Sequence, residues 1–124
     1  MSGALTWVWV ALAGGLGAVC RVAVDRWVSV RVVSALPWGT WTVNVSGSFA
    51  AGVVAGLAAS GLVGPDLRTV VAGGFLGAYT TFSTAMFQAA VELEADQRVA
   101  GVLNLVGTLV TSVLAAALGV VLVR

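Results

Sequence analysis

The sequence predicts an all-α membrane protein with four transmembrane helices, of which the third is broken. Of its 124 residues 60% are hydrophobic and only 9% are charged, which is too few charges to cover a soluble surface. The chain also divides into apolar segments of roughly the 20 residues needed to cross a bilayer. In one of these segments the stretch GGFLGAYTTFST, residues 73–84, places glycines and hydroxyls where a membrane helix is otherwise apolar.

The four apolar segments are separated by short connections that hold nearly all the charges. They run approximately over Leu5–Val24, Trp38–Ala59, Thr69–Val91 and Val99–Val123. The connections leave no room for a soluble domain, so residues 1–124 are expected to form a single transmembrane domain. No Lys or Arg precedes the first segment, which continues into Arg21, and this favours a retained helix over a signal peptide.

The arginines are almost balanced between the two sides of the membrane. Arg26, Arg31 and Arg98 lie in the first and third connections, whereas Arg68 and Arg124 flank the opposite side. Because the Lys/Arg distribution over short loops sets orientation, this near tie permits insertion either way and antiparallel pairing of two chains. The alternative is that one or two arginines are enough to fix a single orientation.

Small residues four apart predict close helix packing. Gly52 and Gly56 form one GxxxG pair, and Gly73 and Gly77 form another. Such pairs let helix backbones approach, since lipid supplies no hydrophobic drive for association. Four short helices enclose little interior, so we expect a pore or pocket to need a second copy of the chain.

Polar side chains form two stripes at helical spacing. The stripes consist of Thr40, Asn44 and Ser48 on the second segment, and of Asn104, Thr108 and Ser112 on the fourth, with Thr111 beside them. Hydrogen bonds between helices explain any single hydroxyl of this kind. Two aligned stripes next to broken backbone instead indicate a polar path, because irregular backbone in hydrocarbon persists only where it faces protein, an ion or water.

The residues that are missing limit what such a path carries. The chain has no His or Lys and no acidic residue near the middle of a predicted helix, which argues against proton relays and against an enzyme. No nucleic-acid partner is expected. Hydroxyls, amides and aromatic ring edges suit a small anion. Arg21 either attracts anions into a vestibule or extends to the interface and pairs with Asp25 one turn on.

Three motifs in order resemble the Fluc (CrcB-type) fluoride channels over essentially the whole chain. The first segment carries GGLGAVCR at 14–21, similar to the glycine-rich segment of that family that ends in arginine. The second carries GTWTVNVSGSFAAG at 39–52, which matches the family pattern GT-x-x-VN-x-x-GSF-x-x-G. The third carries GFLGAYTTFST at 74–84, close to the most specific motif of the family.

The resemblance implies a fluoride-selective channel for passive export, in the cell membrane of a bacterium. It implies an antiparallel, dual-topology dimer with two pores built from both chains, and a structural sodium ion held by the backbone carbonyls of Gly77 and Thr80. Arg21 would lie in the vestibule. The residues expected along the fluoride path are Asn44, Phe82, Ser83, Thr84 and Thr108, together with Thr40 and Ser48 from the Asn44 stripe.

Two departures from the family pattern predict a heterodimer. Ala85 stands where the family has a second pore phenylalanine, and Asn104 stands where it has a pore tyrosine. Some bacteria encode two unlike subunits of this family that assemble together, and degenerate pore positions are what one of such a pair would show. We therefore expect a second subunit of the same family as partner, with a homodimer as the alternative.

Two other classes remain open on the sequence alone. A small multidrug-resistance-type transporter has a similar length and helix number, but it needs a buried carboxylate, and Asp25 lies too near a helix end. A non-conducting membrane assembly subunit would use the glycines for packing alone. It does not explain the run Thr-Thr-Phe-Ser-Thr at 80–84 after a helix break.

Overall fold

The chain folds into helices only, over the residues that the structure describes. The computed structural model describes residues 2–33 and 36–124, apart from the side chains of residues 83 and 84. In this part the long helices are α1 (Gly3–Ser29), α2 (Trp38–Ala59) and α6 (Arg98–Leu122), and each is long and apolar enough to cross a membrane. No strand is present there. The predicted class, an all-α membrane protein, is confirmed.

The chain between α2 and α6 runs through four shorter elements in succession. They are α3 (Pro65–Arg68), the π-helix η1 (Thr69–Leu76), α4 (Gly77–Tyr79) and α5 (Phe82–Glu94). Thr80 and Thr81 lie between α4 and α5 and are not helical, and Thr80 has the extended dihedral angles φ −80° and ψ 154°. The chain thus changes from π-helix to α-helix to extended backbone within the stretch 73–84 that the sequence singles out.

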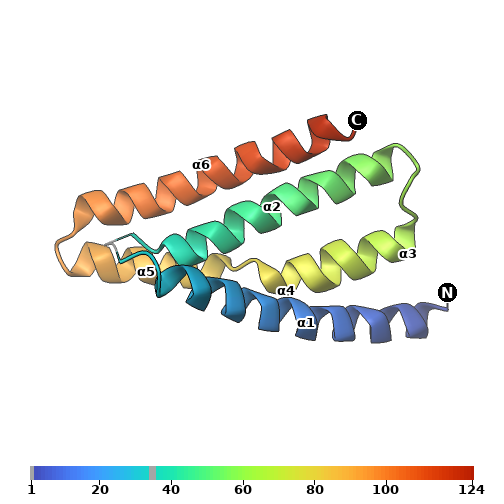
Figure 1. Cartoon of the computed structure of the whole chain (residues 1–124), viewed down its shortest axis with the longest axis horizontal. Helices are drawn as coiled ribbons and strands as arrows, with labels where there is room; N and C mark the ends of the chain where they lie inside the picture. The colour runs from blue at the N-terminus through green and yellow to red at the C-terminus, as the bar shows by residue number, and fades with distance from the viewer. Residues whose placement is uncertain (1, 34–35) are drawn as a thin grey trace.

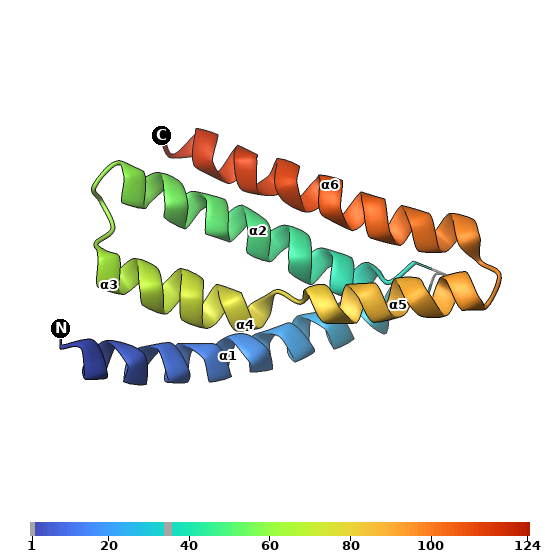
Figure 2. The same ribbon diagram turned by 180° about the vertical axis from the view of Figure 1, so that it is seen from behind.

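The helices lie side by side along one long bundle (Figures 1 and 2). Both termini and the α2–α3 connection lie at one end of the bundle, and the α1–α2 and α5–α6 connections lie at the other (Figure 1). Helix α1 extends to Ser29, beyond the Val24 boundary expected from hydropathy. Polar residues at its end are tolerated because the last turns of a long helix reach the interface, where charged side chains remain hydrated.

Helix α2 packs most extensively on α6, through small residues on both helices. A Cβ atom on Gly52 would overlap the carbonyl oxygen of Ala116, and one on Gly119 would overlap that of Phe49. Trp41 adds a polar contact, because its Nε1 donates to Thr111 Oγ1 at 2.7 Å. The packing predicted for the Gly52 pair is therefore confirmed, and Thr111 takes part in packing as a hydrogen-bond partner of α2.

The Gly73–Gly77 pair does not pack a helix in this way. A Cβ atom on Gly73 would meet nothing within 4 Å. Helix α1 instead meets Gly74, which lies against Val10, while Gly17 of α1 lies against the backbone of Phe75. The i→i+5 bonds of η1 change which residues share a face of the helix. The α-helical spacing therefore pointed to Gly73, whereas Gly74 makes the contact with α1.

Candidate functional site

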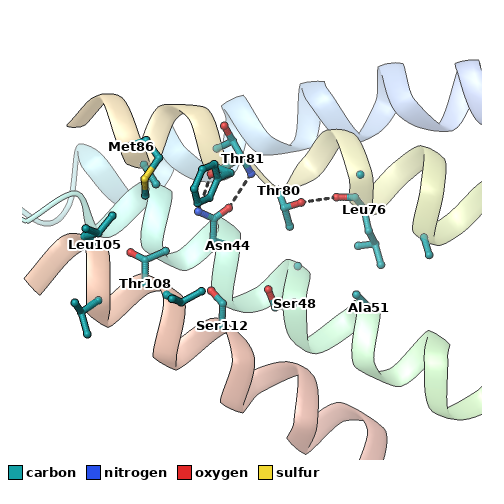
Figure 3. A pocket seen from close by; sticks show the side chains of 17 residues that line it. Asn44, Ser48, Ala51, Leu76, Thr80, Thr81, Met86, Leu105, Thr108 and Ser112 are labelled. Carbon is teal, nitrogen blue, oxygen red and sulfur yellow. Dashed lines mark hydrogen bonds between the residues drawn. The ribbon is translucent and has the colours of Figure 1, made fainter. Parts of the chain in front are cut away.

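The amide of Asn44 holds the non-helical backbone between α4 and α5. Thr81 N–H donates to Asn44 Oδ1 at 2.8 Å, and Asn44 Nδ2 donates to the Thr81 carbonyl oxygen at 2.9 Å (Figure 3). A buried backbone group without such a partner costs about 1–3 kcal/mol. A side-chain amide is suited to this task because it carries both an acceptor and a donor. Asn44 therefore joins the middle of α2 to the interruption.

This arrangement releases the carbonyl of Gly77 from its helical partner. In an α-helix the Gly77 oxygen would accept from the N–H four residues later, which belongs to Thr81. Since Thr81 N–H donates to Asn44, that bond is not made. The Thr80 side chain turns back instead, with its Oγ1 donating to the Leu76 carbonyl at 2.9 Å (Figure 3).

A cavity of about 600 Å³ lies beside the interruption, between α2, α6 and the α4–α5 segment. Its polar lining consists of Asn44, Ser48, Thr80, Thr81, Thr108 and Ser112, and the rest of its wall is apolar or glycine. None of the lining residues is charged. Ser112 Oγ is buried and has no hydrogen-bond partner among the described residues.

The structure brings most of the predicted path residues together in this wall. Besides the polar residues, Gly77, Phe82 and Ala85 line the same cavity. The ring of Phe82 is 73% exposed in the single chain, so it covers the site only if something else packs against it. The side chains of Ser83 and Thr84 lie outside the described residues.

Thr40 and Arg21 lie apart from the main cavity. They line a second, smaller cavity of about 180 Å³ together with Asp25, Val43 and Thr81. Thr81 belongs to the walls of both cavities. The two cavities are therefore neighbours at the residue that Asn44 holds.

Arg21 is half-buried and makes no ion pair with Asp25 within the part of the chain that is described. The Asp25 carboxylate accepts from Ser29 Oγ at 3.3 Å and packs against Gly39 at the start of α2. A carboxylate at this place faces the positive end of the α2 dipole. Arg21 therefore forms no direct ion pair with the acidic residue one turn on, although both residues line the smaller cavity.

Asn104 has a supporting position that the sequence reasoning missed. It is 1% exposed and does not line the main cavity. Its Nδ2 donates to the Ala85 carbonyl at 3.3 Å, and its Oδ1 accepts from Thr108 Oγ1 at 3.3 Å. It thus joins α6 to α5 from behind the cavity wall. No pattern in a single sequence reveals this role, because the partner on α5 lies 19 residues away.

The fold and the site together define a small, all-helical, multi-pass membrane protein with an uncharged polar cavity beside interrupted backbone. The family model for CrcB-like protein, Camphor Resistance (CrcB), matches residues 8–120. The chain belongs to this family.

Relatives that match along most of the chain are named as fluoride channels. Fluoride-specific ion channel FluC 1 of Leifsonia xyli is 42% identical over 110 residues, which is 89% of this chain and 80% of the relative. Fluoride-specific ion channel FluC 2 of Mycobacterium tuberculosis is 42% identical over 113 residues, 91% of this chain and 86% of the relative. Fluoride-specific ion channel FluC of Hahella chejuensis is 39% identical over 118 residues, 94% and 93% of the two chains.

Proposed function

We propose that this chain is a subunit of a fluoride-selective channel through which fluoride leaves the cell passively. The observation that carries the proposal is the main cavity, whose wall offers amide and hydroxyl groups and no charge. Several weak neutral donors replace the tight hydration shell of a small anion without holding it too firmly to leave. The relatives are named as fluoride-specific ion channels, and we therefore take fluoride as the anion.

The driving force is electrical and needs no coupled energy source. Fluoride enters from acidic surroundings as neutral HF and ionises inside. An inside-negative potential then drives the anion outward by about 2.3 kcal/mol per 100 mV. A transporter of the multidrug-resistance type would need a carboxylate in its site, and the wall of the main cavity has none.

Residues Thr69–Val91 would form a third membrane crossing that is interrupted at Thr80 and Thr81, and this crossing would complete a four-helix domain. Interrupted backbone at membrane depth is tolerated where it faces protein or a water-filled cavity, and here the interrupted residues border two cavities. Arg21 in the smaller cavity would attract the anion, which would pass Thr81 and Asn44 to reach the larger one.

A second copy or a related chain would complete the path. The exposed ring of Phe82 and the partly open main cavity both support a missing partner. The arginines at the two ends of the bundle are nearly balanced, which favours an antiparallel, dual-topology dimer. The partner would be an unlike subunit of the family, because Ala85 offers no ring to the cavity.

Liposome flux of fluoride tests the proposed function directly. Fluoride-loaded liposomes containing the purified chain, with and without a related subunit, are expected to release fluoride when a potassium ionophore balances the charge. An electrode measures fluoride, and liposomes loaded with chloride serve as the selectivity control. Release equal to that of protein-free liposomes in both preparations would contradict the proposal.

A structural sodium ion is proposed at the carbonyls of Gly77 and Thr80. The Gly77 oxygen lacks its helical donor, and the extended Thr80 residue turns its own carbonyl away from the helical direction. Hard cations bind oxygen ligands, and backbone carbonyl oxygens are among them. Two chains related by an axis through this point would supply four such oxygens, which a single sodium ion would stabilise together.

Removal of sodium is expected to weaken the dimer and to stop fluoride flux. The carbonyls of both chains would face each other without a cation, and unpaired buried acceptors are costly. Size-exclusion chromatography in a sodium buffer, and in a bulky organic cation at equal ionic strength, measures the dimer, and liposome efflux measures conduction. A dimer equally stable and equally conductive in both buffers would exclude the sodium site.

A further inference from the structure

Glu92 is a buried carboxyl group that the proposed path does not use. It lies near the end of α5, just beyond Val91, where the third apolar segment ends. The residue is only 8% exposed, and its Oε2 is buried without a hydrogen-bond partner in the described part of the chain. A carboxylate in this position is costly, because its Oε2 has neither water nor a donor to compensate the charge.

Within the described part of the chain, no arginine forms an ion pair with this carboxyl group. The elements packed against α5 are α6 and α2, and α2 contains no charged residue. Helix α6 contributes only Arg98, whose side chain is 80% exposed and whose Nε lies 3.7 Å from Asp96 Oδ1. The other charged residue of α5, Glu94, is exposed. No ion pair joins Glu92 to an arginine among the described residues.

A second buried acceptor lies one turn earlier on the same helix. Gln88 Oε1 is also buried and has no hydrogen-bond partner in the part of the chain that is described. Side chains four residues apart on a helix are neighbours. Two unpartnered acceptors one helical turn apart can be satisfied together by one proton, since a protonated carboxyl group donates one hydrogen bond.

We propose that Glu92 is a proton-binding site, in which the neutral carboxyl group donates to Gln88 Oε1 and keeps α5 packed on α6. The proton comes from water and returns to it, so no other reactant is needed. Burial also raises the pKa of Glu92 above its ordinary value. This site lies outside the proposed fluoride path and is independent of it.

The proposal fixes the sign of the pH dependence. Because the folded chain holds the proton more tightly than the unfolded chain, the site stabilises the fold fully below the unfolded pKa. That stability is lost as the pH rises through the higher folded pKa. Above it the buried charge loosens the end of α5 from α6, where Gly101 lies against Ala89 and Leu93.

Thermal unfolding of the purified protein in detergent, at several values between about pH 5 and about pH 9, tests the site. Relative to Glu92→Gln, the wild-type melting temperature is expected to fall by about 5 °C over this range. Glu94→Gln, the exposed neighbour on the same helix, is the matched control and should follow the wild type. Parallel curves for wild type and Glu92→Gln would overturn the proposal.

Two further measurements keep the proposal open to refutation if Glu92→Gln does not fold. Infrared spectroscopy should show the C=O band of a protonated carboxyl that persists in the wild type to a higher pH than the band of an exposed glutamate, and its loss at the pH of an exposed glutamate would contradict the site. In Gln88→Leu the stability contributed by Glu92 should be lost at a lower pH than in the wild type, because the protonated Glu92 carboxyl group no longer has an acceptor for its hydrogen bond. Stabilisation by added sodium or potassium that depends on Glu92 would instead assign a cation to the two oxygens and refute the proton.

Discussion

Replacement of Asn44 by aspartate is expected to reduce fluoride flux to the background of protein-free liposomes. The aspartate can accept from Thr81 N–H but cannot donate to the Thr81 carbonyl, so one of the two bonds across the interruption is lost. The negative charge would also stand at the wall of the main cavity and repel an anion strongly in a low-dielectric site. Both effects act against conduction.

Two further variants separate these causes. Asn44→Leu removes both hydrogen bonds without adding charge, whereas Asn44→Asp keeps one of them. Any flux that Asn44→Leu retains above that of Asn44→Asp therefore gives a lower bound on the effect of the repulsion. Thr42→Val is the matched control on α2, because Thr42 is exposed and lines neither cavity. Its flux should equal that of the wild type. Undiminished flux in Asn44→Asp, with normal insertion and assembly, would remove Asn44 from the path.

The chain alone is expected to conduct about fivefold less fluoride than the chain assembled with a related subunit, because one lost ring contact of about 1 kcal/mol changes a rate about fivefold. In a homodimer both pores would lack the ring missing at Ala85. An unlike partner would supply rings to one pore and leave a single good path. Co-expression with a related subunit from the same genome, followed by liposome efflux, measures the difference.

The variant Ala85→Phe should partly restore flux through the lone chain. Ala85 lines the cavity of about 600 Å³ but is itself 1% exposed, so the added ring has to displace neighbouring atoms to enter the cavity and the rescue is only partial. Ala85→Leu adds volume without a ring edge and is the matched control, so it should not restore flux. Full fluoride conduction by the purified chain alone, unchanged by the partner, would show that a homodimer tolerates alanine at this position.

Hydropathy predicted the membrane class and much of the helix placement correctly. The second apolar segment, Trp38–Ala59, coincides with α2 at both ends. Helix α1 runs past its expected boundary because hydropathy detects the membrane and not the hydrogen bonds, which continue to Ser29. The π-helix η1 was not predicted, since its apolar residues are equally compatible with an α-helix.

Several residues predicted for the site line the main cavity, but their arrangement was not predicted. The stripe of Thr40, Asn44 and Ser48 follows from spacing, yet Thr40 lines a different cavity from the other two. Spacing along one helix cannot show that Asn44 binds the backbone of Thr81, 37 residues later. Such contacts depend on how α2 meets the interruption, and this is set by tertiary packing.

The placement of both termini at one end of the bundle has a consequence for gene fusions (Figure 1). If two copies pair antiparallel, the C-terminus of one copy and the N-terminus of the other emerge on opposite sides of the membrane. A flexible polar linker cannot join them, because it would have to cross the hydrocarbon with unsatisfied backbone groups. A covalent tandem of two such copies therefore requires an additional transmembrane helix between them.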